Sequence, residues 1–316
     1  MKKNNQKIDS NKYLIGVDGG GTKTVAALSD LKGKISKIGK SGSSHPRNLG
    51  LKKAMENVVK AISQILKDKK NAKILSTFIG LPAVAEEFKF RKREIIRKLK
   101  KYKAVSKIFE GKVKIGSDQE VAFRAGVDGD GVMLNTGTGC VAHGWKGKKE
   151  IHVSGWGYLA DEGGAFFVGQ KTFQVILKNL DGRGSKTLLT KLTFKKLKLK
   201  REEDFLNVVY QNPTEIVPLL SVFCDEASQK DDKIAKKIII EAAKESTLAA
   251  KTAIKKLKFQ KNRFPLVLVG SMFKSKIFLE TVKKGIKKFA PKINFILLKE
   301  KPVIGAVKLA IENLKR

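Results

Sequence analysis

The sequence of 316 residues contains no long apolar run, only two cysteines and few aromatic residues. A membrane-spanning helix needs about 18 or more consecutive apolar residues, and the basic N-terminal residues are not followed by the apolar stretch of a secretory leader. Cys140 and Cys224 lie far apart in the sequence, which predicts free thiols rather than a disulfide framework or a cysteine-rich metal site. We therefore expect a cytoplasmic protein that has no contact with a membrane.

Acidic residues are also scarce, because 66 lysines and arginines stand against 30 aspartates and glutamates, for a formal net charge of +36. Such an excess is typical of proteins that neutralise nucleic-acid phosphates. Here, however, the lysines are spread along nearly the whole chain, arginine is scarce, and aromatic side chains do not interleave the basic runs. The distribution favours a solvated lysine-rich surface over a nucleic-acid partner.

The first half of the chain has the pattern of an α/β domain. Residues 13–18 and 24–30 read as two strands around a run of glycines, a third strand follows in GKISKIGKSG, and apolar residues at helical spacing predict a helix over 51–70. A β-rich run over 72–82 and a strand that ends at Ser117, with a helical segment behind it, complete this half.

The second half repeats that order. Residues 131–145 are again strand, glycine turn and strand, and 265–288 read as strand, turn and helix before a last strand and a terminal helix. Between them, 186–258 has a helical pattern that Pro213 and Pro218 are expected to interrupt. The two glycine hairpins indicate an internal duplication of a β-β-β-α-β-α unit.

Three glycine-bearing turns, each behind an apolar strand, are the candidates for chemistry: Asp18 to Thr24, Thr136 to Gly139, and Gly270 to Ser271. Glycine allows a phosphate to approach the backbone closely, and the N–H groups of such a turn can bind an anion. Hairpin turns also require glycine for conformational reasons alone. Neither a P-loop nor a dinucleotide-binding fingerprint is present, so each turn taken singly leaves both readings open.

Taken in order, GVDGGGTKT, GSD, NTGTGC and LVLVGSMFKS resemble the phosphate-1, catalytic, phosphate-2 and adenosine motifs of the actin-like ATPase superfamily, which includes sugar kinases and heat-shock chaperones. The segments VSGWGYLADEGGAFFVGQKTF and LDGRG are similar to the BadF/BadG/BcrA/BcrD ATPase family, and most closely to its N-acetylglucosamine kinase branch. The resemblance, over about residues 13 to 312, implies an α/β, two-domain actin-like ATPase (ribonuclease H-like) fold with the ATP cleft between the domains. Domain I would comprise residues 1–117 plus 298–316, and domain II residues 118–297.

The activity that this resemblance implies is ATP-dependent phosphorylation of an amino sugar, a phosphotransfer to an alcohol group. N-acetylglucosamine at its 6-hydroxyl is the first choice, with glucosamine or another hexose behind it. ATP and Mg²⁺ are the implied cofactors, the amino sugar and ATP are the implied partners, and a homodimer is left open. One rival is an ATPase that activates a 2-hydroxyacyl-CoA dehydratase or benzoyl-CoA reductase through a cysteine-bound iron–sulfur cluster. Another is a non-catalytic sugar-sensing or nucleic-acid-associated protein.

The resemblance also assigns roles to individual positions. Asp18 would hold Mg²⁺ through water, and Asp118 would be the catalytic base that accepts the proton of the attacking hydroxyl. The positions matched to ATP binding lie in the three turns: Gly19, Gly20, Gly21, Thr22, Lys23, Thr136, Gly137, Thr138, Gly139, Gly270, Ser271 and Ser275. The positions matched to the sugar are His45, Gly155, Trp156, Gly157 and Asp161.

Ordinary structural roles are alternatives to several of these functional assignments. Asp118 follows a serine at a helix start and is also a candidate helix N-cap, and Asp161 with Glu162 could cap the helix that follows them. Trp156 between two glycines could anchor its loop, and His45 could be an ordinary surface histidine. Departures from the family pattern leave the phosphate turns intact and leave open which sugar is used; they occur at Ser44, His45, Cys140, Ala160 and Lys230–Asp231.

Overall fold

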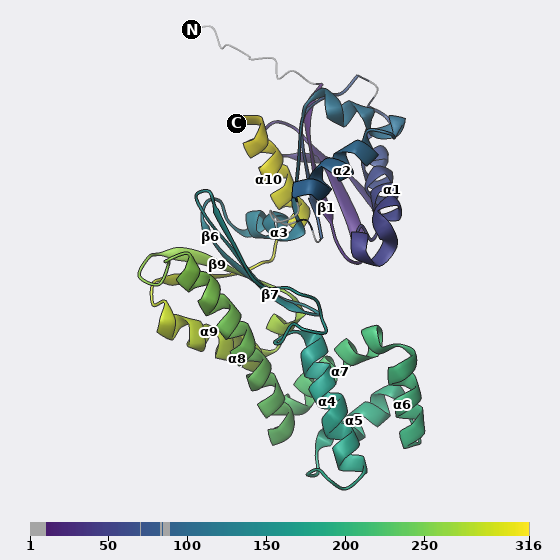
Figure 1. The fold of residues 1–316 in the computed structure, drawn as a ribbon, viewed down its shortest axis with the longest axis vertical. Helices are drawn as coiled ribbons and strands as arrows, with labels where there is room; N and C mark the ends of the chain where they lie inside the picture. The colour runs from purple at the N-terminus through teal and green to yellow at the C-terminus, as the bar shows by residue number, and fades with distance from the viewer. Residues whose placement is uncertain (1–10, 70, 83, 85–88, 316) are drawn as a thin grey trace, which may run out of the picture. The chain divides into compact units, whose positions relative to one another are not determined.

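A computed structural model describes residues 11–69, 71–82, 84 and 89–315 of the chain (Figure 1). Two compact units are present: unit 1 comprises Met1–Asp128 and Leu298–Arg316, and unit 2 comprises Gly129–Leu297. Each unit is built on one five-stranded sheet with helices packed on it. The expected two-domain α/β architecture is therefore confirmed. Within the described residues, no helix combines the length and the apolar character needed to cross a membrane.

The sheet of unit 1 has the strand order β3-β2-β1-β4-β5, in which β1, β2 and β3 form an antiparallel meander and β4 and β5 run parallel to β1. The strands are β1 (Lys12–Gly19), β2 (Lys23–Ser29), β3 (Ile35–Gly42), β4 (Lys73–Leu81) and β5 (Lys112–Ser117). The helices are α1 (Pro46–Leu66), α2 (Lys89–Leu99), the 3-10 helix η2 (Lys103–Glu110), α3 (Asp118–Gly126) and α10 (Pro302–Lys315).

Strand β1 is apolar and buried from Leu14 to Val17 because both faces of the sheet are covered. Ile15 and Val17 pack on one face against a core that includes residues of α1. Leu14 packs on the other face with Phe78 and with residues of α3 and α10. Figure 1 shows α1 and α10 on opposite sides of this sheet. The central strand is thereby buried, and its end carries the first glycine turn.

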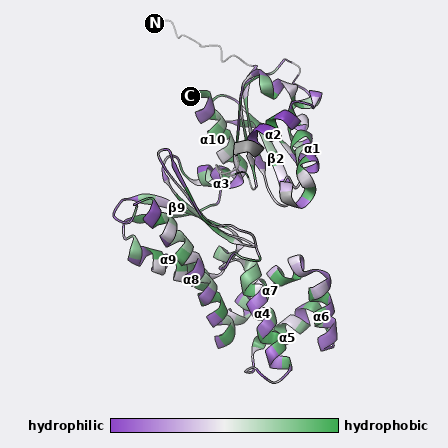
Figure 2. Cartoon of the chain, in the orientation of Figure 1, coloured by the Kyte–Doolittle hydropathy of each residue, from purple (hydrophilic) through white to green (hydrophobic). Residues whose placement is uncertain are grey.

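The sheet of unit 2 has the order β10-β9-β6-β7-β8, and β9 runs parallel to both β6 and β10. The strands are β6 (Gly131–Thr136), β7 (Cys140–Lys146), β8 (Lys149–Ser154), β9 (Phe264–Val269) and β10 (Ile293–Leu297). The helices are α4 (Ala165–Leu180), α5 (Leu188–Leu197), α6 (Glu202–Gln211), α7 (Pro213–Gln229), α8 (Lys233–Lys256), the 3-10 helix η3 (Ser271–Lys274) and α9 (Lys276–Phe289). Figure 2 shows polar and apolar residues alternating around α8 and α9, as expected of amphipathic helices that cover a sheet.

The two sheets share one topology. Read from the third strand of each unit, β3-β2-β1-β4-β5 and β8-β7-β6-β9-β10 have the same order and the same parallel and antiparallel pairings. In both sheets the hairpin of the first two strands holds a glycine turn. This agreement supports the internal duplication inferred from the sequence.

The compact units divide after Asp128 and Leu297, whereas the expected domain limits lay after residues 117 and 297. The difference is helix α3, which packs on α10. Gly305 of α10 approaches the backbone of α3 so closely that a Cβ atom there would collide with the Val121 carbonyl. An ion pair of 3.4 Å between Arg124 and Glu312 adds to the contact. Packing with a helix distant in sequence therefore keeps α3 in unit 1.

Two helix limits differ from the sequence-based expectation. Helix α1 begins at Pro46 rather than at residue 51, with a kink at Gly50, whose φ is 73°. Pro218 was expected to interrupt a helix and instead lies inside α7, so that expectation was wrong. Pro213 does separate α6 from α7, as expected, and occupies the first turn of α7, where proline is favoured.

Candidate active site

The glycine turn between β1 and β2 is closed by a hydrogen bond of 2.9 Å from the Gly20 N–H to the Lys23 carbonyl. The Gly20 carbonyl accepts a second bond, of 3.1 Å, from the Ser44 N–H, which ties the turn to the segment behind β3. A Cβ atom on Gly19 would collide with the Ser44 hydroxyl, whereas one on Gly21 would meet nothing within 4 Å. The turn therefore needs glycine at residue 19 for packing, and at residue 21 glycine leaves open space.

Asp18 and Asp118 lie at the same end of the unit 1 sheet. Asp18 of β1 pairs with Gly80 of β4, and the next residue of β4, Leu81, pairs with Ser117 at the end of β5. Asp118 follows as the first residue of α3. The parallel strands β1, β4 and β5 thus bring together two carboxylates that are far apart in the sequence.

The N-cap of α3 is Ser117, not Asp118. The Ser117 hydroxyl accepts a hydrogen bond of 3.0 Å from the Glu120 N–H, which is the usual bond of a serine cap. The alternative that Asp118 serves as the N-cap is therefore wrong. The Asp118 carboxylate sits beside the first N–H groups of the helix instead, where backbone dipoles favour a negative charge.

The two carboxylates have raised pKa values. Burial raises the pKa of Asp18 to about 6, against the opposing effect of the Lys23 ammonium. Burial and the neighbouring charge of Asp18 raise the pKa of Asp118 to about 7, although the N–H groups at the start of α3 act to lower it. A carboxylate with a pKa near neutrality is well matched to accept a proton at physiological pH. A divalent cation would relieve the repulsion between the pair, and carboxylate oxygens are ligands that Mg²⁺ prefers.

The glycine turn between β6 and β7 is docked on the start of α4. The Ala165 N–H donates to the Gly137 carbonyl at 2.8 Å, and the Phe166 N–H donates to the Thr138 carbonyl at 3.0 Å. Around Gly137 a Cβ atom would find only one neighbour, at 3.9 Å. The Thr136 hydroxyl is fully buried and has no hydrogen-bond partner among the described residues. This turn also combines tight backbone packing with space beside a glycine.

Gly270, at the end of β9, packs directly on this second turn. Its φ is 115°, a value that favours glycine, and a Cβ atom there would collide with the Thr136 carbonyl. Ser271 then opens the short helix η3, and the hydroxyl of Ser275 caps α9 by accepting a bond of 3.3 Å from the Phe278 N–H. The phosphate-2 and adenosine segments named by the resemblance are thus neighbours within unit 2.

Asp161 organises the loop behind β8. Its buried carboxylate accepts hydrogen bonds from the Ser154 hydroxyl at 3.1 Å, from the Trp156 N–H at 2.8 Å and from the Gly157 N–H at 3.3 Å. The N-cap of the following helix is Gly164, which makes no side-chain cap bond, so the capping alternative for Asp161 and Glu162 is wrong. Ser154 was missed from the sequence because its bond with Asp161 depends on the positive φ values of the loop.

Trp156 does not anchor this loop, because 79% of its surface is exposed. The loop is held instead through the Trp156 N–H, which leaves the indole ring at the surface. Gly155 and Gly157 both have positive φ, at 80° and 121°, so glycine is required on either side of the ring. The arrangement displays a large aromatic side chain on a rigidly bonded backbone.

Two histidines and both cysteines can be placed in the fold. His45 is the N-cap residue of α1, and its N–H donates to the Ser43 hydroxyl at 3.2 Å. His143 is buried and lies 2.6 Å from a carboxylate oxygen of Glu150. Cys140 and Cys224 are buried thiols, and burial raises the pKa of each to about 12. Both thiols lie within the apolar core of unit 2.

Comparison with known proteins gives a consistent result. The chain matches the model of the BadF/BadG/BcrA/BcrD ATPase family over residues 15–310. It is 30% identical to the N-acetylmuramic acid/N-acetylglucosamine kinase of Clostridium acetobutylicum, over 95% of this chain and 98% of that protein. It is also 30% identical to the N-acetyl-D-glucosamine kinase of Dictyostelium discoideum, over 97% of this chain and 100% of that protein.

Solved structures show the same fold at lower identity. A proposed N-acetylglucosamine kinase from Chromobacterium violaceum has a TM-score of 0.72 at 18% identity, with 95% of this chain and 99% of that chain covered. A ROK family glucokinase from Streptomyces griseus has a TM-score of 0.57 at 14% identity, with 95% and 99% covered. Together with the family match, these likenesses place the two sheets in the actin-like ATPase fold, and the chain belongs to the BadF/BadG/BcrA/BcrD ATPase family.

Proposed function

We propose that this protein is an ATP-dependent kinase of an amino sugar, with N-acetylglucosamine as substrate and its 6-hydroxyl as the acceptor. The names of the two curated relatives support the substrate class. The observation that carries the proposal is the pair Asp18 and Asp118, which the sheet of unit 1 brings together beside a glycine turn.

Asp118 would act as the general base. Its pKa of about 7 makes it partly ionised at neutral pH, and its place at the start of α3 fixes the direction of the carboxylate. It would accept the proton of the sugar hydroxyl while the hydroxyl oxygen forms a bond to the γ-phosphorus and the bond from that phosphorus to the β–γ bridging oxygen breaks, which leaves ADP. Phosphoryl transfer depends mainly on such positioning and on neutralised charge.

Asp18 would hold Mg²⁺ through water. Its partly buried carboxylate at the end of β1 suits a hard cation, and the charge repulsion with Asp118 favours one there. Bound Mg²⁺ would supply charge neutralisation on the ATP phosphates. In the two glycine turns, Gly21 and Gly137 leave the room that phosphate oxygens would need, and the buried Thr136 hydroxyl offers a donor. The other positions proposed to bind ATP are Gly19, Gly20, Thr22, Lys23, Thr138, Gly139, Gly270, Ser271 and Ser275.

The loop from Gly155 to Asp161 would contact the sugar. Its exposed Trp156 ring offers an apolar face of the kind on which pyranose C–H groups pack, and Asp161 would hold the loop rather than touch the substrate. Gly155 and Gly157 would let the loop backbone approach the sugar, and His45 is proposed as a further sugar-binding residue. If this assignment is right, Trp156→Ala should raise the KM for the sugar and leave the melting temperature unchanged, because the ring is exposed.

The rival iron–sulfur activator receives no support from the two cysteines. Cys140 donates to the Ser246 hydroxyl at 3.5 Å, and Cys224 lies 3.6 Å from the Ala235 carbonyl, so the thiols are engaged in different parts of the core of unit 2. Among the residues that the structure describes, no group of three or more metal-binding side chains is found. A non-catalytic sensor would not need the pair of carboxylates, Asp18 and Asp118. Measured turnover of ATP with a sugar would distinguish a kinase from such a sensor.

The proposal is tested by coupled ADP release with N-acetylglucosamine, N-acetylmuramic acid, glucosamine and glucose, followed by NMR assignment of the phosphorylated hydroxyl. Asp118→Asn should lower turnover by a factor of about 100 to 10,000, the usual contribution of a general base. Asp68→Asn is the matched control, because Asp68 is an exposed carboxylate of unit 1 paired with Lys37, and it should turn over as wild type. Absence of sugar-stimulated ADP release, or full activity of Asp118→Asn, would show the proposal to be wrong.

A further inference from the structure

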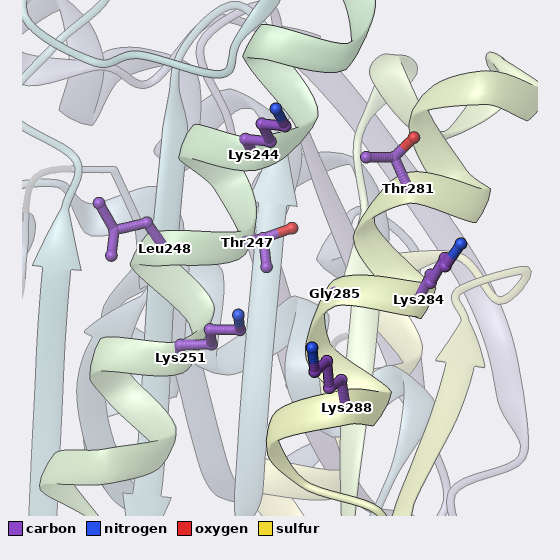
Figure 3. Close-up of a pocket in the computed structure, with 8 residues that line it drawn as sticks. All are labelled: Lys244, Thr247, Leu248, Lys251, Thr281, Lys284, Gly285 and Lys288. Carbon is purple, nitrogen blue, oxygen red and sulfur yellow. The ribbon is translucent and has the colours of Figure 1, made fainter.

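A groove of about 590 Å³ runs between α8 and α9 on unit 2 (Figure 3). Each helix contributes four residues at the spacing i, i+3, i+4 and i+7, which places them on one face. The lining residues are Lys244, Thr247, Leu248 and Lys251 of α8 and Thr281, Lys284, Gly285 and Lys288 of α9. None of them belongs to the glycine turns or to the loop proposed for catalysis.

The floor of this groove is apolar. A Cβ atom on Gly285 would lie 2.8 Å from the Thr247 methyl carbon, so the glycine lets the two helices approach closely. The hydroxyls of Thr247 and Thr281 each donate to a carbonyl of their own helix at 2.7 Å. Thr281 therefore offers methyl surface to a ligand above the buried Thr247, and Leu248, whose side chain points away from α9 in Figure 3, adds an isobutyl group that is 60% exposed.

The rim carries four positive charges and no negative one. The glutamates on the same helices interact with residues outside the groove. Glu241 pairs with Lys171 at 2.9 Å, and Glu280 lies 4.0 Å from Lys276. Glu245, the remaining acid on this part of α8, interacts with Glu162. Within the described part of the chain, the four lysines of the groove make no ion pair. The Lys251 ammonium lies 5.8 Å from the centre of the Phe289 ring, but no carboxylate of the described residues pairs with any of the four, so a ligand with carboxylates would find four ammonium groups without an anionic partner.

We propose that this groove binds an acidic amphipathic helix of a partner protein. The walls run over two helical turns, about 10 Å of helix axis, which suits the helix-in-groove mode of recognition: apolar residues would contact the floor and acidic residues the rim. The charge of the lysines complements such a helix. A second copy of this chain, with a formal net charge of +36, would be repelled.

Two other anionic ligands fit less well. The groove lies along the middle of α8 and the C-terminal half of α9, whose backbone N–H groups are used within the helices, so it lacks the helix start or turn that typically binds phosphate. No arginine and no aromatic residue lines it, and these are the side chains that read and stack nucleic-acid bases.

The test uses a fluorescein-labelled helical peptide of about 18 residues, with leucines at i, i+3, i+4 and i+7 flanked by glutamates, and a scrambled isomer of the same composition. Binding to the full-length protein is followed by fluorescence anisotropy at about 150 mM salt, where distant charges are screened. The groove variant is Lys251→Glu/Lys288→Glu. The control variant, Lys101→Glu/Lys261→Glu, makes the same change in net charge at exposed lysines outside the groove.

Wild type should bind the amphipathic peptide at least about tenfold more tightly than the scrambled one, and the groove variant should lose about tenfold or more while the control stays within about threefold. Leu248→Ser, which keeps every charge, should also weaken binding. Unchanged ADP release and circular dichroism show that each variant is folded. The proposal fails if wild type does not bind the peptide, if the scrambled peptide binds as tightly, or if both double variants lose equally. It also fails if a DNA duplex competes more strongly than the peptide and loses affinity in the groove variant, since the site would then be one for nucleic acid.

Discussion

Replacing Asp118 with asparagine should abolish most turnover and at the same time stabilise the folded protein. The side chain is partly buried next to Asp18, and both effects disfavour its charged form. An amide of the same shape removes the charge and keeps the packing. One variant therefore tests both the proposed catalytic role of Asp118 and the loss of folding stability caused by its buried charge.

The sign of the effect follows from the two pKa values. In the unfolded chain the carboxyl group ionises above its usual pKa of 3.8, whereas in the folded protein it ionises above about 7. As the pH rises from about 4 to about 7, the carboxyl group ionises in the unfolded chain but not yet in the folded protein, which lowers the free energy of the unfolded state. The free energy of unfolding therefore falls over this range, and the full loss of stability is present above about pH 7.

A pKa raised by about three corresponds to roughly 4 kcal/mol of stability lost at about pH 8. That figure already includes the attraction between the carboxylate and the N–H groups at the start of α3, because these groups contribute to the pKa of about 7. The variant should therefore gain roughly 4 kcal/mol at about pH 8, and roughly 2 kcal/mol at about pH 5, where the carboxyl group is protonated in the folded protein but ionised in the unfolded chain. For a protein of this size that is roughly 8–16 °C in melting temperature at the higher pH.

Differential scanning calorimetry at the two pH values, with ADP release on the same samples, measures both effects. Asp68→Asn is again the control, because its pKa is lowered by a hydrogen bond from Lys37, so removal of that charge should give no gain at either pH. A melting temperature of Asp118→Asn at or below that of wild type at the higher pH would refute the reasoning. An equal gain at both pH values would do the same, because it could not come from titration of the carboxylate.

Three further outcomes are expected. In wild type the carboxyl carbon of Asp118 should titrate near pH 7 by NMR, and Asp18→Asn should lower that pKa, because the neighbouring negative charge contributes to it; an unchanged pKa would show that the two side chains do not interact. Gly21→Ala and Gly137→Ala should leave the stability within about 0.5 kcal/mol, since a Cβ atom at either position collides with nothing, and should raise the KM for ATP if phosphates occupy that space. Asp161→Ala should cost about 1–3 kcal/mol by thermal unfolding, because it leaves buried donors without an acceptor, and should raise the KM for the sugar; wild-type values of both would contradict its role in the loop.

Local sequence patterns were sufficient for most of the elements that carry the proposed site. The apolar run before Asp18 predicts β1 because a strand covered on both faces must be apolar throughout, and the glycines behind it predict the turn. The β6–β7 hairpin, with Thr136 at its end, follows from the same pattern. Pro218 shows the limit of such reasoning, because a proline in the sequence predicts a helix break, whereas packing of the flanking Val217 and Leu220 in the core can hold the helix through it.

Roles within one short segment were harder to assign. Ser117 and Asp118 are both good N-cap residues, and only the backbone conformation, extended at Ser117 and helical from Asp118 onward, decides between them. Asp161 likewise stands where a cap is expected, but its carboxylate turns back to three donors of the preceding loop. These choices depend on a few backbone angles rather than on residue type.

By itself the sequence determined the order of the strands and helices, the three glycine turns, and the family to which their arrangement is similar. The tertiary structure decided what residue types alone could not. It assigned α3 to unit 1 through its contact with α10, and it brought Asp18 and Asp118 to one end of the sheet through the adjacency of β1, β4 and β5. The raised pKa of Asp118 depends on that proximity and on burial, because electrostatic interactions depend on distance in space and not on separation along the chain.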